Sequence, residues 1–211
     1  QLGLRWMILC YNMRNPLGDG CHEPGNAGLS QLGRAFVTEM NRVGMLIDAS
    51  HAGVRSSLDI IEQSVHPVIF SHSSARAIAD HERNITDEQI DACAARGGVV
   101  GINGIGAFLS PDGSASVAAL VRHIDHIAQR VGADHVGLGL DVVFYQDFMQ
   151  KLFDSGPMMA SRGYPRPPWE DIKPEELEAL VAALMALGYP GPAIQGILGG
   201  NFLRVAAAVW K

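Results

Sequence analysis

Short apolar runs alternate with longer amphipathic stretches along the first two thirds of the chain. The runs, too short and too rich in apolar or β-branched residues for helices, predict strands at 4–11, 45–49, 68–71, 99–103 and 136–140. The stretches between them predict helices at 30–43, 54–63, 87–96 and 116–130. Ser30 and Thr86 are the expected N-caps. Because the strands are continuously apolar and alternate with helices, this order predicts a parallel sheet covered by helices on its outer side.

The last third of the chain has a different character. Residues 144–174 are rich in proline, methionine and aromatic residues, and we expect a long loop that lies over the mouth of the site and limits substrate size. Three further helices are expected at 174–187, 192–198 and 201–210. No internal repeat is visible, so residues 1–211 are interpreted as a single domain.

Polar residues at the strand ends favour one α/β architecture over another. Each of the five predicted strands ends at or just before one of Tyr11, His51, His72, Asn103 and Asp141. Barrel enzymes place their chemistry at these ends, whereas an open doubly wound sheet concentrates it at one switch point and often shows G-x-G-x-x-G, which is absent here. A (β/α)8 TIM-type barrel needs about 250 residues. We therefore expect the last five βα units of such a barrel, with the first strands upstream of Gln1.

Composition narrows the classes of partner. With 47% hydrophobic and 18% charged residues, the chain is typical of soluble globular domains. The net charge of -6 gives no basic stripe for nucleic acid, and no run approaches the roughly 20 apolar residues of a membrane span. Three cysteines, an odd count, favour a reducing compartment, so a cytoplasmic location is expected; a Cys10–Cys21 disulfide is the alternative.

Two strand ends share a design that suits a metal. The strings IDASH and IFSH each end an apolar strand with serine and histidine, His51 and His72. Imidazoles from neighbouring strands suit Zn²⁺, which activates water as a nucleophile. The alternative is that both histidines are hydrogen-bonded structural residues.

Several longer strings carry a resemblance to a known family. They are GLSQLGRAFVTEMNRVGMLIDASH, PVIFSHSSARAIADHERNITDEQI, GGVVGING, VGLGLD and GGNFLRV. In this order and spacing they resemble successive blocks of the membrane (renal-type) dipeptidase family, within the metal-dependent amidohydrolase barrels. The resemblance implies a (β/α)8 metallopeptidase with two zinc ions that hydrolyses dipeptides, often with a D-residue on the C-terminal side, and it is compatible with a homodimer.

The resemblance also implies roles for individual residues. His51 and His72 match the two histidines that bind one of the two zinc ions, and Arg83 matches the arginine that binds the substrate carboxylate. Asp141 matches the aspartate that moves a proton from the attacking water to the leaving amine. Tyr11 stands where the family usually has a substrate-binding histidine; its hydroxyl can donate to a carbonyl oxygen but carries no positive charge.

The chain shows only half of the family's metal ligands. The family takes its H-x-D pair from the first strand and its bridging glutamate from a later one, and both strands are expected before Gln1. His123 and His126, three residues apart on a helix expected outside the barrel, are interpreted as surface or supporting residues.

The sequence thus predicts a zinc-dependent dipeptidase that cleaves a peptide bond with metal-activated water. One rival is an amidohydrolase acting on cyclic amides, lactones or N-acyl compounds, because fold does not fix substrate. The other is a catalytically silent barrel that binds a small ligand.

Overall fold

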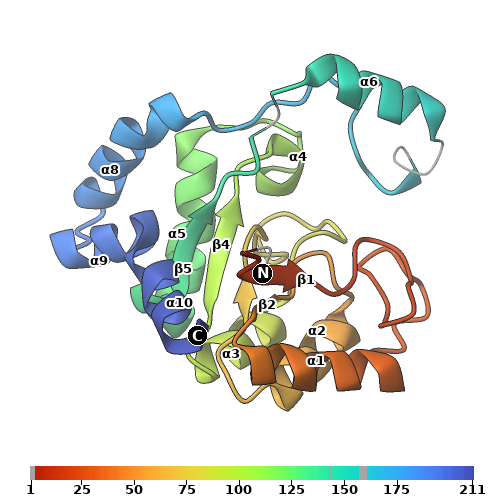
Figure 1. Ribbon diagram of the computed structural model, residues 1–211. Coiled ribbons are helices and arrows are strands. Elements are labelled where there is room, and N and C mark those ends of the chain that lie inside the picture. The colour runs from red at the N-terminus through yellow and green to blue at the C-terminus, as the bar shows by residue number, and fades with distance from the viewer. Residues whose placement is uncertain (1–2, 143, 157–160) are drawn as a thin grey trace.

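A single parallel sheet organises the chain, and its five strands follow one another in chain order (Figure 1). The computed structural model describes residues 3–142, 144–156 and 161–211. The strands are β1 (Trp6–Ile8), β2 (Leu46–Asp48), β3 (Ile69–Phe70), β4 (Val99–Asn103) and β5 (Val136–Gly139). All four strand pairings are parallel. The predicted α/β class with a parallel sheet is confirmed.

The strand predicted at 4–11 is shorter than expected. β1 ends at Ile8, and the carbonyl of Leu9 accepts a hydrogen bond of 2.8 Å from the Asn15 side chain. The Leu9 carbonyl thus bonds to a side chain and not to the backbone of a neighbouring strand. The strand ends before it, and Tyr11 lies in the loop that follows.

Helices follow the strands and pack along the outside of the sheet (Figure 1). The first five are α1 (Gln31–Val43), α2 (Val54–Gln63), α3 (Asp87–Ala95), α4 (Gly106–Leu109) and α5 (Val117–Val131). Both predicted N-caps are confirmed, because Ser30 accepts from the Gly33 amide at 3.0 Å and Thr86 forms a capping box with Gln89. The short helix α4 was not predicted, since four residues carry too little periodicity.

The remaining helices lie in three places: beside α5, against the second face of the sheet, and beyond the strand ends. They are the 3-10 helices η1 (Ala133–His135) and η2 (Pro174–Glu176), the helices α6 (Gln146–Ser155), α8 (Leu177–Ala186) and α9 (Gly191–Gln195), the π-helical turn η3 (Gly196–Gly200), and α10 (Asn201–Val209). Figure 1 shows α6 beyond the arrowheads of β4 and β5, away from the other helices. The prediction of a loop over residues 144–174 is therefore wrong for residues 146–155, which form α6. No helix within the described ranges is long and apolar enough to cross a membrane.

The three central strands, β2, β3 and β4, are buried on both faces, whereas β1 at the edge is partly exposed. Ile47, Phe70 and Val100 belong to the main core, whereas their chain neighbours Leu46, Ile69 and Val99 pack against α10. This alternation follows from the two-residue period of a strand. At Gly137 an added Cβ would lie 2.5 Å from the Phe202 ring, so glycine lets α10 approach the sheet.

His123 corrects an expectation of the sequence. We expect it at the surface or in a supporting role, and the surface alternative is wrong. Its side chain is fully buried, accepts from the Ala75 amide and bonds to the Leu109 carbonyl, both at 3.0 Å. Burial lowers its pKa to about 4, so the ring is neutral. His126, on the same helix, is half-buried and bonds to Asp87 at 2.9 Å. The three cysteines are free thiols, so the Cys10–Cys21 alternative is not formed.

Candidate active site

Two histidine rings meet at the carboxyl ends of β2 and β3. The Nε2 atoms of His51 and His72 lie 2.8 Å apart. His51 Nδ1 donates to the Asn12 side-chain oxygen at 2.7 Å. The Ser71 hydroxyl donates its own hydrogen bond to the Asp48 carboxylate, so it accepts from His72 Nδ1 at 2.6 Å. Both ring protons are then on Nδ1, and two Nε2 lone pairs face each other.

Two facing lone pairs fit a cation. Neutral imidazole nitrogens are ligands of zinc, and ligating histidines usually donate their other N–H to a fixed acceptor, as both rings do here. Burial, and then the charge of Arg83, lowers the pKa of His51 and of His72, so both rings are neutral near pH 7. Within the described residues no group of three or more histidine, cysteine or acidic side chains could hold a metal. The pair therefore supplies only part of a coordination shell.

Arg83 is a buried cation on the loop between β3 and α3. Its side chain is only 4% exposed, and its guanidinium donates to the His72 carbonyl at 3.3 Å and lies 5.5 Å from the centre of the Phe108 ring. Among the described residues no carboxylate pairs with it. A guanidinium has several N–H donors, and a buried charge without a counter-ion is costly. The arrangement therefore suits an anionic group of a ligand.

Asp141 follows β5, at the same edge of the sheet. Its carboxylate accepts from the Asn103 side-chain amide at 3.1 Å. The other atom of that amide accepts from the Ile105 backbone at 2.7 Å, which fixes its orientation. Asp141 itself is exposed to the cavity, so its remaining lone pairs are available to a ligand.

Tyr11 covers the histidine pair from one side. Its ring stacks on His51 with centres 4.1 Å apart and planes 24° from parallel. Three residues of the site, Asn12, His51 and Asp141, have positive φ angles of 56°, 66° and 55°. Such backbone is costly for residues other than glycine and is often found at functional sites. It turns these side chains toward a common space.

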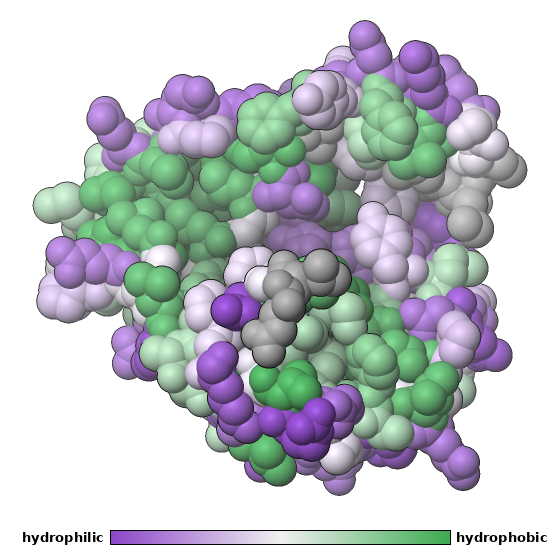
Figure 2. Space-filling model, viewed as in Figure 1, coloured by the Kyte–Doolittle hydropathy of each residue, from purple (hydrophilic) through white to green (hydrophobic). Residues whose placement is uncertain are grey.

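That space is a cavity of about 360 Å³. It is lined by the predicted residues Tyr11, His51, Arg83 and Asp141 together with a wall of apolar and aromatic side chains. His72 reaches the site through its contact with His51. Figure 2 shows this face hollowed between the α6 region and the strands. Its volume lies near the lower end of the range of about 300–1,000 Å³ for small-molecule pockets.

The segment after β5 covers the cavity, as its length and composition predicted. Phe148 and Met149 of α6 and Trp169 line it. The segment after α6 contacts the rest of the protein at two points. Asp171 pairs with Ile105 in an isolated antiparallel β-bridge, and the Tyr164 hydroxyl forms a hydrogen bond of 2.8 Å with His22 Nε2.

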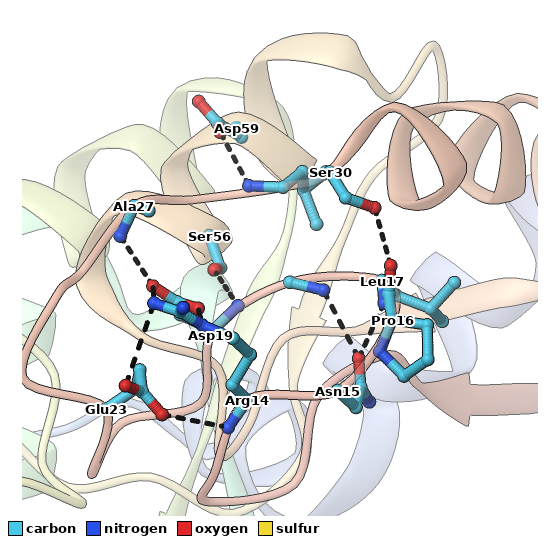
Figure 3. Close-up of polar contacts among 12 residues, drawn as sticks. Arg14, Asn15, Pro16, Leu17, Asp19, Glu23, Ala27, Ser30, Ser56 and Asp59 are labelled. Carbon is cyan, nitrogen blue, oxygen red and sulfur yellow. Dashed lines mark hydrogen bonds and ion pairs between the residues drawn. The ribbon is translucent and has the colours of Figure 1, made fainter.

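A polar network holds the loop between β1 and α1 that carries Tyr11, Asn12 and His22 (Figure 3). Asp19, which is buried, accepts from Arg14 and from the Ala27 amide, both at 2.6 Å. Its own amide donates to Ser56 of α2 at 3.1 Å, which fixes the loop to a helix.

Sequence reasoning missed several residues of the site. Asp48, Asn12, His22, Tyr164 and Trp169 were not among the expected functional residues. Asp48 had a readable signal, because a carboxylate in an apolar strand must be buried with partners. Asn12, His22 and Tyr164 act through partners far away in the chain, for which one sequence gives no signal.

Comparison with known proteins gives a consistent result. A family model described as membrane dipeptidase (peptidase family M19) matches residues 1–211. Dipeptidase tcpJ of Claviceps purpurea is 34% identical over 99% of this chain and 45% of its own length. Dipeptidase verJ of Clonostachys rogersoniana is 33% identical over 99% of this chain and 49% of its own length. The chain thus spans about half the length of these curated relatives.

Solved structures agree with the fold. An amidohydrolase from Pseudomonas aeruginosa is 30% identical with a TM-score of 0.83, covering 99% of this chain and 66% of that chain. A metallopeptidase from Rhodobacter sphaeroides, liganded with a phosphinate mimic of the dipeptide L-Ala-D-Ala, is 27% identical with a TM-score of 0.75. That match covers 99% of this chain and 57% of the other.

Proposed function

The chain belongs to the membrane dipeptidase family, peptidase family M19, and from this membership we propose that it carries the substrate-binding part of a zinc-dependent dipeptidase. The observation that supports this most directly is the position of Arg83, a buried cation without an acidic partner among the described residues, in one cavity with His51 and Asp141. A free dipeptide offers a carboxylate to Arg83 and a peptide bond to the other two residues.

The five-stranded sheet is proposed to be part of a (β/α)8 barrel that forms one domain. Its strands run parallel in chain order, and the curated relatives are about twice as long. The remaining strands would come from a segment outside this chain. That segment would also supply the other ligands of a site for two zinc ions, of which His51 and His72 would hold one.

Each residue has a defined task in the proposed reaction. Zinc, when bound, polarises the scissile carbonyl and lowers the pKa of a water molecule. Arg83 holds the free carboxylate through two parallel hydrogen bonds. Tyr11 donates a hydrogen bond from its hydroxyl to the carbonyl oxygen. Asp141 accepts a proton from the attacking water and passes it to the leaving amine.

The same site disfavours those rival substrates that lack a free carboxylate. A cyclic amide or a lactone without one would leave the Arg83 charge buried and unpaired when it binds.

Free and capped dipeptides test the proposal in the full-length protein. A dipeptide whose C-terminus is a carboxamide should be a poor substrate. Arg83→Lys should raise KM for the free dipeptide by about 10- to 100-fold, since an ammonium lacks the bidentate fork. Asp141→Asn should lower kcat by a factor on the order of 10²–10⁴ while metal content is unchanged. Equal cleavage of capped and free dipeptides by the wild type would favour a cyclic-amide or N-acyl substrate instead.

A further inference from the structure

An aromatic cluster separate from the main core lies beside Arg83. It consists of Ile105, Phe108, Tyr164 and Trp169, all between 3% and 8% exposed. The Phe108 and Tyr164 rings meet edge to face with centres 5.8 Å apart, and Tyr164 stacks on Trp169 at 5.8 Å. All four residues also line the cavity, so the cluster is a wall of the site as well as a packing contact.

The polar atoms of this wall are already occupied. The Tyr164 hydroxyl donates to His22 Nε2 at 2.8 Å, because His22 Nδ1 gives its proton to the Glu82 carboxylate at 2.7 Å. The Trp169 indole N–H donates to the Pro165 carbonyl at 2.7 Å. What these rings present to the cavity is therefore apolar surface, which offers no hydrogen-bond partner to a polar side chain.

The wall begins where the carboxylate is proposed to bind. The Arg83 guanidinium carbon lies 5.5 Å from the centre of the Phe108 ring. In an amino acid the carboxylate and the side chain leave the same carbon atom. A carboxylate held by Arg83 therefore brings the side chain of the C-terminal residue next to Phe108, with Tyr164 and Trp169 beyond it.

We propose that Phe108, Tyr164 and Trp169 form a subsite for a large apolar, above all aromatic, side chain on the C-terminal residue of the substrate. This inference rests on the proposed dipeptidase function and specifies its substrate class. Aromatic rings favour stacked or edge-to-face partners, and burying a large side chain removes more apolar surface from water than burying a small one.

A series of dipeptides with a common N-terminal alanine and C-terminal glycine, alanine, leucine or phenylalanine tests the subsite in the full-length, zinc-loaded protein. For the wild type, kcat/KM should rise by about tenfold or more from glycine to phenylalanine. Trp169→Ala should remove most of this rise. Phe108→Leu, which keeps an apolar side chain, should reduce the rise without the risk of a large cavity. Trp210→Ala is the matched control, because Trp210 is partly exposed and lies near the C-terminus, and this variant should keep the full rise in kcat/KM.

The results separate the two proposals. The subsite is overturned if the wild type cleaves all four dipeptides with equal kcat/KM. It is also overturned if Trp169→Ala lowers kcat/KM for all four by the same factor. Neither result overturns the dipeptidase function. If no dipeptide is cleaved, the dipeptidase function fails, and calorimetry with N-acetylphenylalanine and N-acetylglycine decides the subsite. Tighter binding of the phenylalanine compound that is lost in Trp169→Ala supports it, and equal binding overturns it.

Discussion

At the scale of single residues, the proton positions on the two histidines depend on a short relay. Asp48, buried at the end of β2, accepts the Ser71 hydroxyl proton, and Ser71 in turn accepts from His72 Nδ1. Asp48 also accepts from the Ser50 and Ser71 amides at 2.9 and 3.1 Å, which fixes the orientation of its carboxylate. The relay leaves the lone pair of His72 Nε2 directed at His51.

Removing the middle of the relay should weaken metal binding. Ser71→Ala deletes the acceptor of the His72 proton, so we expect zinc affinity to fall by about 10- to 100-fold, measured by competition with a chelator. Ser73→Ala is the control, because the Ser73 hydroxyl is buried but has no hydrogen-bond partner in the described structure. Equal affinities of the two variants would argue against a ligand role for His72.

His123 makes stability depend on pH. Its folded pKa of about 4 lies below the ordinary 6.5, so between these values the unfolded chain binds a proton that the folded chain does not. The stabilisation that comes from the low pKa of His123 is complete above pH 6.5 and is lost as the pH falls toward 4. At pH 4.5 the loss is about 2–3 kcal/mol.

Urea denaturation at pH 7 and pH 4.5 measures this effect. The free energy of unfolding should fall with acidification in the wild type, and in His123→Gln it should fall by about 2–3 kcal/mol less. The burial that lowers the pKa of His22, His51 and His81 acts in the same direction, so some loss remains in the variant. An identical pH dependence in both proteins would contradict the buried neutral state of His123.

The meeting of His51 and His72 could be predicted because it depends only on local patterns. Each histidine ends an apolar run, and consecutive runs become neighbouring parallel strands. The bond between His22 and Tyr164 could not be predicted, because 142 residues separate the two and neither lies in a regular element. The sequence left open whether His123 lies at the surface or supports other residues, because its partners, the Ala75 amide and the Leu109 carbonyl, lie in other segments of the chain.

At the scale of elements, the segment that follows β5 both lines the cavity and is anchored to α4. α6 contributes Phe148, Met149 and Leu152 to the cavity, while the returning segment is held against α4 by a bond of 2.8 Å from the Gly106 amide to the Glu170 carbonyl. None of these side chains belongs to the main core. The sequence predicted the cover from its position after Asp141, but not that part of it is a helix.

Shortening this cover should alter substrate choice more than stability. If residues 144–156 are replaced by a short glycine-serine linker, we expect longer peptides to enter, so that the rate with a tripeptide relative to a dipeptide increases. The thermal midpoint should change little, because the main core is intact. A variant that unfolds at a markedly lower temperature and keeps its preference would show that the segment is structural support, not a lid.

At the scale of the whole molecule, parallel order brings the carboxyl ends of all five strands to one edge. Residues far apart in the sequence, such as Tyr11 and Asp141, therefore line one cavity. This arrangement follows from the alternation of strands and helices, so the sequence could predict it. Closure into a barrel could not be derived in the same way, because it depends on strand partners for β1 and β5 rather than on any pattern within the five strands.

Zinc should join two strands of this sheet and stabilise the whole fold, because a ligand that binds only the folded state raises its stability. At a free zinc concentration of about 100 times Kd the gain is about 2.7 kcal/mol, which corresponds to a rise of about 5–10 °C in Tm for a chain of this size. We expect a chelator to reverse the rise, and His51→Ala and His72→Ala to abolish most of it. His66→Ala, a half-buried histidine outside the cavity, is the matched control and should keep the full shift. Differential scanning calorimetry measures all four proteins, and a shift that survives in both site variants would place the metal elsewhere.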